Sequence, residues 1–228
     1  MLTCLPFGPK RLSERFSIPM MLFTSRILSL FLFMAVVLIP VKAIAVSTIL
    51  LFGDSIIAGY GLPEKDTLST KLEGFFQKEG LDVQIINGGV SGDTTSGGLS
   101  RLQWTLNEHK PDLVFVALGG NDVLRGFPAS VTKQNVKGML EILQQNGTPT
   151  ILSEVQAPPN MGIKYAFEFN SIYEDLADDY DVPLYPFLLE DIFGKSTYMK
   201  NDAIHPNARG IDHIVENLGP FLVDYIDN

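Results

Sequence analysis

Two segments near opposite ends of the chain carry residues that together could cleave an acyl bond. Gly53-Asp54-Ser55 offers a serine hydroxyl directly after an apolar run, and Asp202 stands three residues before His205. An aspartate at this spacing can accept a hydrogen bond from Nδ1–H of the histidine, which leaves Nε2 free to take a proton from a serine. A serine activated in this way attacks acyl carbons. These residue types predict nucleophilic catalysis.

Two residues between these segments could stabilise the negative charge that develops on the acyl oxygen. Asn121 follows two glycines, and its side-chain amide is a neutral hydrogen-bond donor. Gly92 lies in a second glycine-rich segment and would present its backbone N–H with no side chain in the way. Both residue types fit an oxyanion hole.

Each of these residues also has a simpler structural interpretation. Ser and Asp are common helix caps, so Gly53-Asp54-Ser55 fits a cap, while Asn121 fits a turn. An isolated Asp-x-x-His is often a surface pair. Metal binding competes as a function for His205, but none of the three histidines stands in a His-x-His or His-x-x-x-His spacing, so the sequence predicts no metal site. Taken singly, the residues leave the structural interpretations open.

Short apolar runs alternate with longer helical patterns along the chain, and this alternation predicts the elements that position the residues. We expect strands at 47–52, 83–86, 113–118, 150–153 and 182–185, and helices at 65–79, 96–109, 131–145, 168–179 and from 208 onward. Regular β-α-β alternation gives right-handed crossovers and a parallel sheet. The predicted fold is therefore α/β: one three-layer α/β/α domain over residues 46–228, with a flavodoxin-like five-stranded parallel sheet.

The expected strands bring the candidate residues to one edge of the sheet. Ser55, Gly92 and Asn121 follow the first, second and third strands, and ligands of such sheets bind outside the carboxyl ends of the strands. A non-catalytic flavodoxin-like binding module, with its glycine loops around a phosphate or flavin, is the alternative from a different class. That alternative gives Asp202 and His205 no role.

Several strings of residues carry a resemblance to a known family. They are Gly53-Asp54-Ser55-Ile56-Ile57-Ala58-Gly59-Tyr60, Ser91-Gly92-Asp93-Thr94, Gly119-Gly120-Asn121-Asp122-Val123-Leu124-Arg125-Gly126 and Asp202-Ala203-Ile204-His205. In this order and spacing, over residues 46–225, the chain resembles the SGNH hydrolases, also called GDSL-type lipases and esterases. It looks most like the bacterial periplasmic branch known as thioesterase I, arylesterase or lysophospholipase.

The resemblance implies a role for each matched residue. Ser55 corresponds to the nucleophile, and its backbone N–H corresponds to the first oxyanion donor. Gly92 and Asn121 correspond to the other two donors, and Asp202 and His205 complete the catalytic triad. The implied reaction is hydrolysis of a carboxylic ester or thioester through an acyl-enzyme, with no metal or other cofactor.

The substrate is less well defined by the sequence than the chemistry. Lysophospholipids, aryl esters and acyl thioesters are the expected substrates, and an O-acetyl esterase acting on a cell-envelope carbohydrate is the alternative. The segment 157–169 follows the fourth strand at the edge where the site is expected, so Pro158, Met161 and Tyr165 could bind substrate or merely cover the core. Trp104 is expected to be a packing residue.

Residues 1–45 have the pattern of an export signal. Basic residues precede an apolar run at 27–39, and Ala43-Ile44-Ala45 follows as a cleavage site, with cleavage after Ala45. The run is shorter than the about 20 apolar residues of a membrane span. We therefore expect a periplasmic or secreted enzyme without stable membrane insertion once the signal is removed. An uncleaved N-terminal membrane anchor is the alternative.

The charge and cysteine content restrict the partners of the remaining chain. Five of the 17 basic and one of the 26 acidic residues lie before residue 46, so the remainder has a formal charge near −13. Such an acidic surface disfavours nucleic acid. The only cysteine, Cys4, lies in the expected signal, so the domain would fold without a disulfide. We expect a monomer whose partner is a small ester or lipid substrate.

Overall fold

The computed structural model describes residues 48–227, and the expected export signal lies outside these residues. The strands are β1 (Thr48–Gly53), β2 (Gln84–Gly89), β3 (Leu113–Ala117), β4 (Thr150–Ser153) and β5 (Leu184–Tyr185). They pair in parallel in the order β2-β1-β3-β4-β5, which is the order of flavodoxin-like sheets. The predicted α/β fold with five parallel strands is confirmed.

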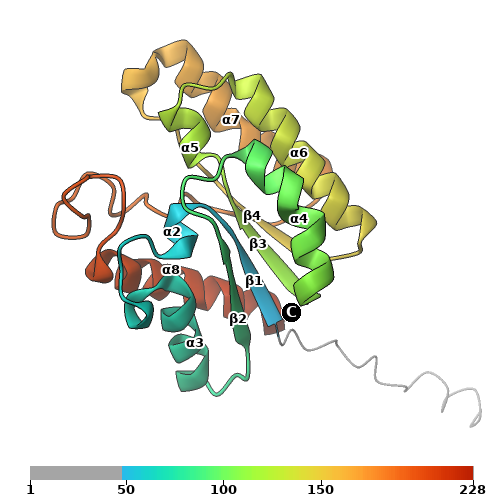
Figure 1. The fold of residues 1–228 in the computed structure, drawn as a ribbon, viewed down its shortest axis with the longest axis vertical. Coiled ribbons are helices and arrows are strands. Elements are labelled where there is room, and N and C mark those ends of the chain that lie inside the picture. The colour runs from blue at the N-terminus through green and yellow to red at the C-terminus, as the bar shows by residue number, and fades with distance from the viewer. Residues whose placement is uncertain (1–47, 228) are drawn as a thin grey trace, which may run out of the picture. The chain divides into compact units, whose positions relative to one another are not determined.

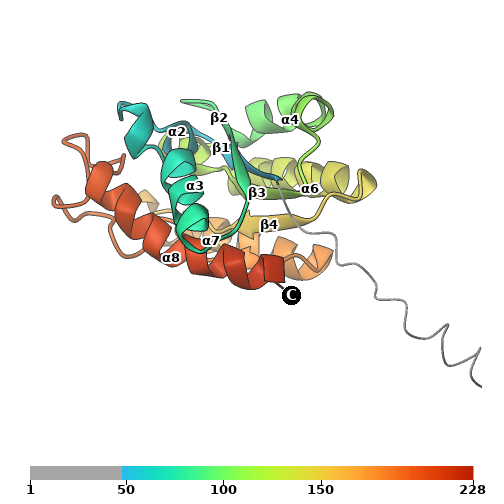
Figure 2. The same ribbon diagram turned by 90° about the horizontal axis from the view of Figure 1, so that it is seen from below.

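Helices cover both faces of this sheet (Figure 1 and Figure 2). The helices are α2 (Ser55–Ala58), α3 (Leu68–Lys78), α4 (Thr95–His109), α5 (Gly120–Leu124), α6 (Ala129–Gln145), α7 (Ile163–Tyr180) and α8 (Ala208–Asp227), with 3-10 turns at Glu64–Asp66 and Pro159–Met161. The side chains of β1 alternate between two apolar clusters. Ile49 and Leu51 pack with α3 and α8, whereas Leu50 and Phe52 pack with α4, α6 and α7. Burial on both faces explains why the strand is apolar throughout.

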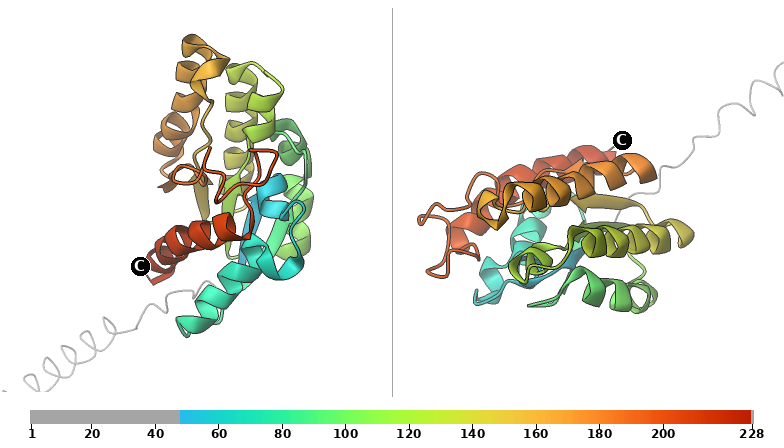
Figure 3. Two further views of the ribbon diagram at one scale, coloured as in Figure 1. Left: turned by 90° about the vertical axis from the view of Figure 1, so that its left-hand side faces the viewer. Right: turned by 90° about the horizontal axis from the view of Figure 1, so that it is seen from above.

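The carboxyl ends of the strands carry the loops that matter for the site. β1 leads directly into α2 and β3 leads into α5, and Figure 1 shows both short helices beyond the same end of the sheet. The segment between β5 and α8 also reaches this end, and Figure 3, left, shows it in orange-red beside α2. Lys200 from that segment donates hydrogen bonds to the carbonyl oxygens of Tyr60 and Gly61, at 3.1 and 3.2 Å, just after α2.

The largest departure from the predicted elements is the start of α7. The helix begins at Ile163, whereas the sequence predicts a start near residue 168. Ile163 and Phe167 are 85% and 76% exposed, so apolar residues occupy the outer face of the first turns and obscure the helical pattern. A stack of Tyr165 on Phe169, with ring centroids 5.8 Å apart, ties these turns to the core.

Two smaller predictions also differ from the structure. β2 continues to Gly89, because Asn87, Gly88 and Gly89 still pair with β1 although their composition suggests a turn. Trp104 was expected to pack, but 66% of its surface is exposed on α4, so this prediction is wrong. The neighbouring Leu102 is fully buried and anchors the helix instead.

Candidate active site

Ser55 is the first residue of α2, directly after β1. Asp54 caps this helix, since its Oδ1 accepts a hydrogen bond from the N–H of Ile56 at 3.0 Å. Gly53 is required for the close approach of strand and helix, because a Cβ there would lie 2.3 Å from Cγ1 of Ile57 and 2.8 Å from the carbonyl oxygen of Ala117. As the first helical residue, Ser55 presents a backbone N–H that has no acceptor within the helix.

Asp202 and His205 meet Ser55 from the segment before α8. Nε2 of His205 lies 2.8 Å from Oγ of Ser55, and Nδ1 lies 2.8 Å from Oδ2 of Asp202. The other carboxylate oxygen of Asp202 accepts the backbone N–H groups of Ile204 and His205, both at 3.0 Å. These backbone hydrogen bonds hold the pKa of Asp202 well below its usual range. The result is a continuous relay from an ionised carboxylate to a serine hydroxyl.

A lysine and a tyrosine support the imidazole of His205. The ring of Tyr60 lies against that of His205, with centroids 4.7 Å apart. Nζ of Lys200 lies 5.1 Å from the centroid of the Tyr60 ring, and the N–H of Lys200 donates to the carbonyl oxygen of His205 at 2.8 Å. Lys200 therefore holds both partners of the aromatic contact.

The two predicted oxyanion residues, Gly92 and Asn121, follow β2 and β3 respectively. Asn121 is the second residue of α5, and its Nδ2 donates to the carbonyl oxygen of Asp93 at 2.8 Å. Gly92 has a φ of 80°, which favours glycine, and its carbonyl oxygen accepts a hydrogen bond from Nη2 of Arg125 at 2.8 Å. Arg125 thus links the start of the segment after α5 to the backbone carbonyl of Gly92.

Asp54 places a second carboxyl group beside the relay. It is 7% exposed, and burial raises its pKa to about 6. The carboxylates of Asp93 and Asp122 raise this pKa further, while the hydrogen bond from Ile56 and the nearby His205 oppose the increase. Oδ2 of Asp54 lies 3.5 Å from Nδ2 of Asn121, so Asp54 contacts the oxyanion residue as well as capping α2.

A cavity of about 190 Å³ opens beside these residues. Ser55, Asn121 and His205 line it together, whereas Gly92 is not among its lining residues. The rest of the wall is largely apolar and includes Val123, Leu124, Val155, Phe187, Leu188 and Phe193. A cavity of this composition accommodates an apolar arm of a substrate.

The segment 157–169 contributes less to the cavity than the sequence suggested. Pro158 lines it, but Met161 and Tyr165 do not. Tyr165 donates its hydroxyl to the carbonyl oxygen of Phe127 at 2.9 Å, so it joins α7 to the loop after α5. The residues that sequence reasoning missed are Phe187, Leu188, Leu189 and Phe193, which follow β5 and line the cavity. The rule that ligands bind at the carboxyl ends of strands could have found this segment as well.

Two other features are absent from the part of the chain that the structure describes. Within residues 48–227, no group of three or more His, Cys, Asp or Glu side chains is arranged to hold a metal ion. Among the helices of the same residues, none has the length and apolar character needed to cross a membrane.

Comparison with known proteins shows which family the chain resembles in sequence and fold. Residues 51–212 match the GDSL-like Lipase/Acylhydrolase family. An arylesterase from Vibrio mimicus is 37% identical over 201 residues, which cover 88% of this chain and 99% of that protein. Thioesterase 1/protease 1/lysophospholipase L1 from Escherichia coli is 35% identical over 194 residues, covering 85% and 88%. The crystal structure of the psychrotrophic esterase EstA from Pseudoalteromonas sp. has a TM-score of 0.76 and 34% identity, covering 80% of this chain and 100% of that one.

The chain belongs to the GDSL-like lipase/acylhydrolase family, as its resemblance to the SGNH hydrolases predicted. Membership of this family makes it a carboxylic ester hydrolase. The alternative of a non-catalytic binding module finds no support among these three relatives, since each bears the name of an enzyme.

Proposed function

We propose that the protein hydrolyses carboxylic esters and thioesters with Ser55 as the nucleophile, His205 as the general base and Asp202 as the group that orients His205. The observation that carries this proposal is the hydrogen-bonded relay, in which both ring nitrogens of His205 have a partner at 2.8 Å. Asp202 fixes the tautomer in which Nδ1 carries the proton, so Nε2 is the basic atom that faces the serine hydroxyl.

The reaction proceeds in two steps of acyl transfer. Oγ of Ser55 forms a bond to the acyl carbon while its proton passes to Nε2 of His205. The backbone N–H groups of Ser55 and Gly92 and the amide of Asn121 stabilise the oxyanion. The carbon–oxygen or carbon–sulfur bond to the leaving group then breaks, and the leaving group takes the proton from His205. Water, deprotonated by His205, releases the acid from the acyl-enzyme.

The apolar cavity supports substrates with an acyl chain or an aryl group, in keeping with the arylesterase and lysophospholipase names of the relatives. Rates with p-nitrophenyl acetate, octanoate and palmitate test this substrate class. We expect kcat/KM to rise from acetate to octanoate, because the chain buries apolar surface in the cavity. A rate that collapses beyond two carbons would instead favour the O-acetyl esterase.

Labelling with a fluorophosphonate tests the nucleophile. The Oγ of an activated serine displaces fluoride from phosphorus, so the wild-type protein takes up one label. We expect Ser55→Ala to remain unlabelled and inactive. Ser153→Ala is the matched control, since Ser153 is another serine of the same cavity, and it should label like the wild type. Equal labelling of Ser55→Ala and Ser153→Ala would assign the nucleophile elsewhere.

Export to the periplasm is a separate part of the proposal. It is supported by the basic residues, the apolar run at 27–39 and the Ala43-Ile44-Ala45 sequence. Intact-mass analysis of the protein from the periplasm of a Gram-negative host should give a chain that begins at Val46. Ala45→Asp should retain the signal, because signal peptidase requires small residues there. A mature mass that includes residues 27–39 would support the N-terminal anchor.

A further inference from the structure

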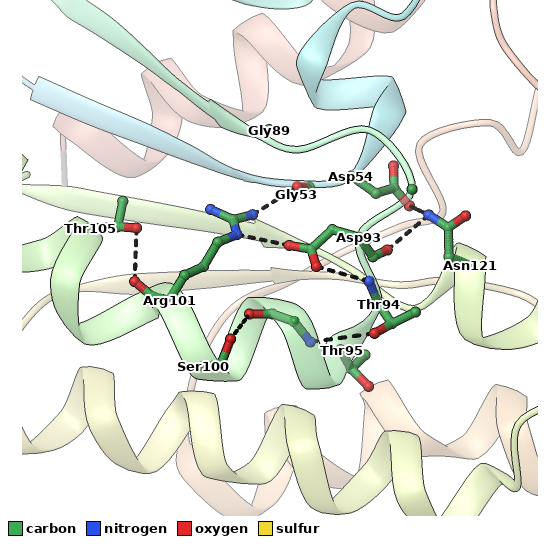
Figure 4. A network of polar contacts seen from close by, with 12 residues as sticks. Gly53, Asp54, Gly89, Asp93, Thr94, Thr95, Ser100, Arg101, Thr105 and Asn121 are labelled. Atoms are coloured by element: carbon green, nitrogen blue, oxygen red, sulfur yellow. Dashed lines mark hydrogen bonds and ion pairs between the residues drawn. The ribbon is translucent and has the colours of Figure 1, made fainter.

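Arg101 connects two of the segments that form the site (Figure 4), although it is not among the residues that line the cavity. It belongs to the second turn of α4, and its Nη2 donates to the carbonyl oxygen of Gly53 at 3.0 Å. Its Nε donates to Oδ2 of Asp93 at 2.8 Å. The guanidinium carbon lies 3.9 Å from the centroid of the Phe52 ring, so the group also stacks on the core.

The acceptors of this guanidinium are adjacent to the reacting groups. Gly53 is two residues before Ser55, and its carbonyl oxygen also accepts the N–H of Val90 at 3.0 Å. Asp93 directly follows Gly92. The guanidinium of Arg101 therefore fixes the position of the chain just before Ser55 relative to the chain just after Gly92.

Asp93 extends the connection to the third oxyanion donor. Its carboxylate accepts the N–H of Thr94 at 3.1 Å as well as Nε of Arg101. Its carbonyl oxygen accepts Nδ2 of Asn121 at 2.8 Å, and Figure 4 shows this residue between Arg101 and Asn121. The position of the Asn121 amide thus depends on the backbone that Arg101 fixes through Asp93.

The glycine at position 97 of α4 leaves room for the carboxylate of Asp93. A Cβ at Gly97 would lie 1.9 Å from Oδ1 of Asp93, closer than any side chain tolerates. The side chains of Arg101 and Asp93 are 21% and 10% exposed, so water screens their ion pair only in part. Such a pair, with two directed hydrogen bonds from one planar group, defines a geometry that a lysine ammonium does not reproduce.

We propose that Arg101 is a positioning residue for the oxyanion hole: through Gly53 and Asp93 it sets the N–H of Ser55, the N–H of Gly92 and the amide of Asn121 relative to one another. The inference rests on the proposed function of those three donors. Because Arg101 does not line the cavity, its loss leaves ground-state binding unchanged and lowers the stabilisation of the tetrahedral intermediate.

Arg101→Met tests this role, since methionine keeps an unbranched apolar stem on Phe52 and removes both hydrogen bonds. We expect kcat for p-nitrophenyl butyrate to fall on the order of 10²-fold, the effect of a displaced or lost oxyanion donor, while KM stays within about twofold. Arg101→Lys should recover only part of the loss. Lys133→Met is the control, because it removes the cation of an exposed ion pair with Asp175 and should leave kcat unchanged.

A transition-state analogue separates positioning from a general loss of structure. An alkyl trifluoromethyl ketone adds to the serine and places an oxyanion in the hole, so its inhibition constant should rise in proportion to the loss of kcat. Active sites are counted with the fluorophosphonate, so that unfolded protein does not enter the comparison. An inhibition constant and kcat per active site that match the wild type would overturn the proposal, while ester hydrolysis by Ser55 would stand.

A second variant serves if Arg101→Met does not fold. Gly97→Ala leaves the arginine in place and displaces only the carboxylate of Asp93. It should raise the inhibition constant of the trifluoromethyl ketone and lower kcat about tenfold or more with KM unchanged. Small displacements of catalytic groups are enough to slow a reaction by this much. A folded Gly97→Ala protein with normal kcat and inhibition constant would likewise overturn the role assigned to the Arg101–Asp93 pair.

Discussion

The carboxylate of Asp202 holds His205 at two points. Oδ2 lies 2.8 Å from Nδ1 of the imidazole, and Oδ1 accepts the backbone N–H of the same residue at 3.0 Å. Ala203 between them adopts a φ of 57°, which makes the turn tight enough for this double contact. The side chain and the backbone of His205 are therefore fixed by one group, and the ring can face Ser55 in only one orientation.

Asp202→Asn should preserve this turn and lose most of the activity. The amide oxygen can still accept the backbone N–H groups, but the amide nitrogen facing Nδ1 favours the wrong tautomer of His205. We expect kcat to fall on the order of 10³–10⁴-fold, with the fold intact by circular dichroism. Asp191→Asn is the matched control, because Asp191 lies 3.7 Å from His213 outside the site. Activity of Asp202→Asn near that of the control would refute the relay.

The buried carboxyl group of Asp54 should make the protein less stable as pH rises through the mildly acidic range. Its pKa is about 6 in the folded protein and 3.8 in an exposed aspartate, so the folded state binds more protons between these values. Stability therefore falls as pH rises from about 4 to 6, and the full cost above that range is about 3 kcal/mol. Asp202 acts in the opposite direction: its lowered pKa contributes stability that is lost only as pH falls below about 4.

Urea unfolding at a series of pH values measures the contribution of Asp54. The free energy of unfolding of Asp54→Asn, which does not ionise, should fall less between pH 4 and pH 6.5 than that of the wild type, by about 2 kcal/mol. Asp178→Asn, an exposed position on α7, should follow the wild-type curve. Parallel curves for Asp54→Asn and the wild type would show that burial does not raise the pKa of Asp54 as described.

The sequence predicts the sheet, its order and the residues at its edge better than it predicts the shape of the site. Buried strands are largely apolar, so β1, β3 and β4 could be located to within a residue or so. Helices of four or five residues, such as α2 and α5, have too little periodicity to detect. Their presence follows from the tertiary arrangement, because α2 packs in the space left by glycines of β1 and β2.

Sequence reasoning could not identify a residue that affects the site only through its contacts with other residues. Arg101 bonds Asp93, which is eight positions away in the sequence, and Gly53, which is 48 positions away. Neither spacing forms a recognisable sequence pattern. The cavity wall is another example, since Leu124, Phe187 and Phe193 come from two separate segments that meet only in the folded chain. The five predicted site residues could be proposed from the sequence because their motifs have the order and spacing of the SGNH hydrolases. These residues are Ser55, Gly92, Asn121, Asp202 and His205.

Asn121→Ala removes a donor from the oxyanion hole and should lower kcat on the order of 10²–10³-fold with a small change in KM. Asn121→Asp should be at least as inactive, because it places a negative charge beside the oxyanion and 3.5 Å from the buried Asp54. Asn146→Ala is the matched control, since its amide bonds Gln103 and Ile142 at the end of α6. A rise in KM with kcat unchanged would indicate that Asn121 binds substrate and does not stabilise the intermediate.

Leu124 should influence the length of the acyl chain that the enzyme prefers, because it belongs both to the exposed surface and to the wall of the apolar cavity. It is 60% exposed and lines the cavity, so a longer chain would bury it. Leu124→Ser should raise KM for p-nitrophenyl octanoate by about tenfold, the effect of losing contact with roughly two methylene groups, and should leave hydrolysis of the acetate unchanged. Val131→Ser, which alters an exposed apolar residue at the start of α6, is the control. If Leu124→Ser impairs both esters equally, the acyl chain does not pass over Leu124 and binds against another part of the cavity wall.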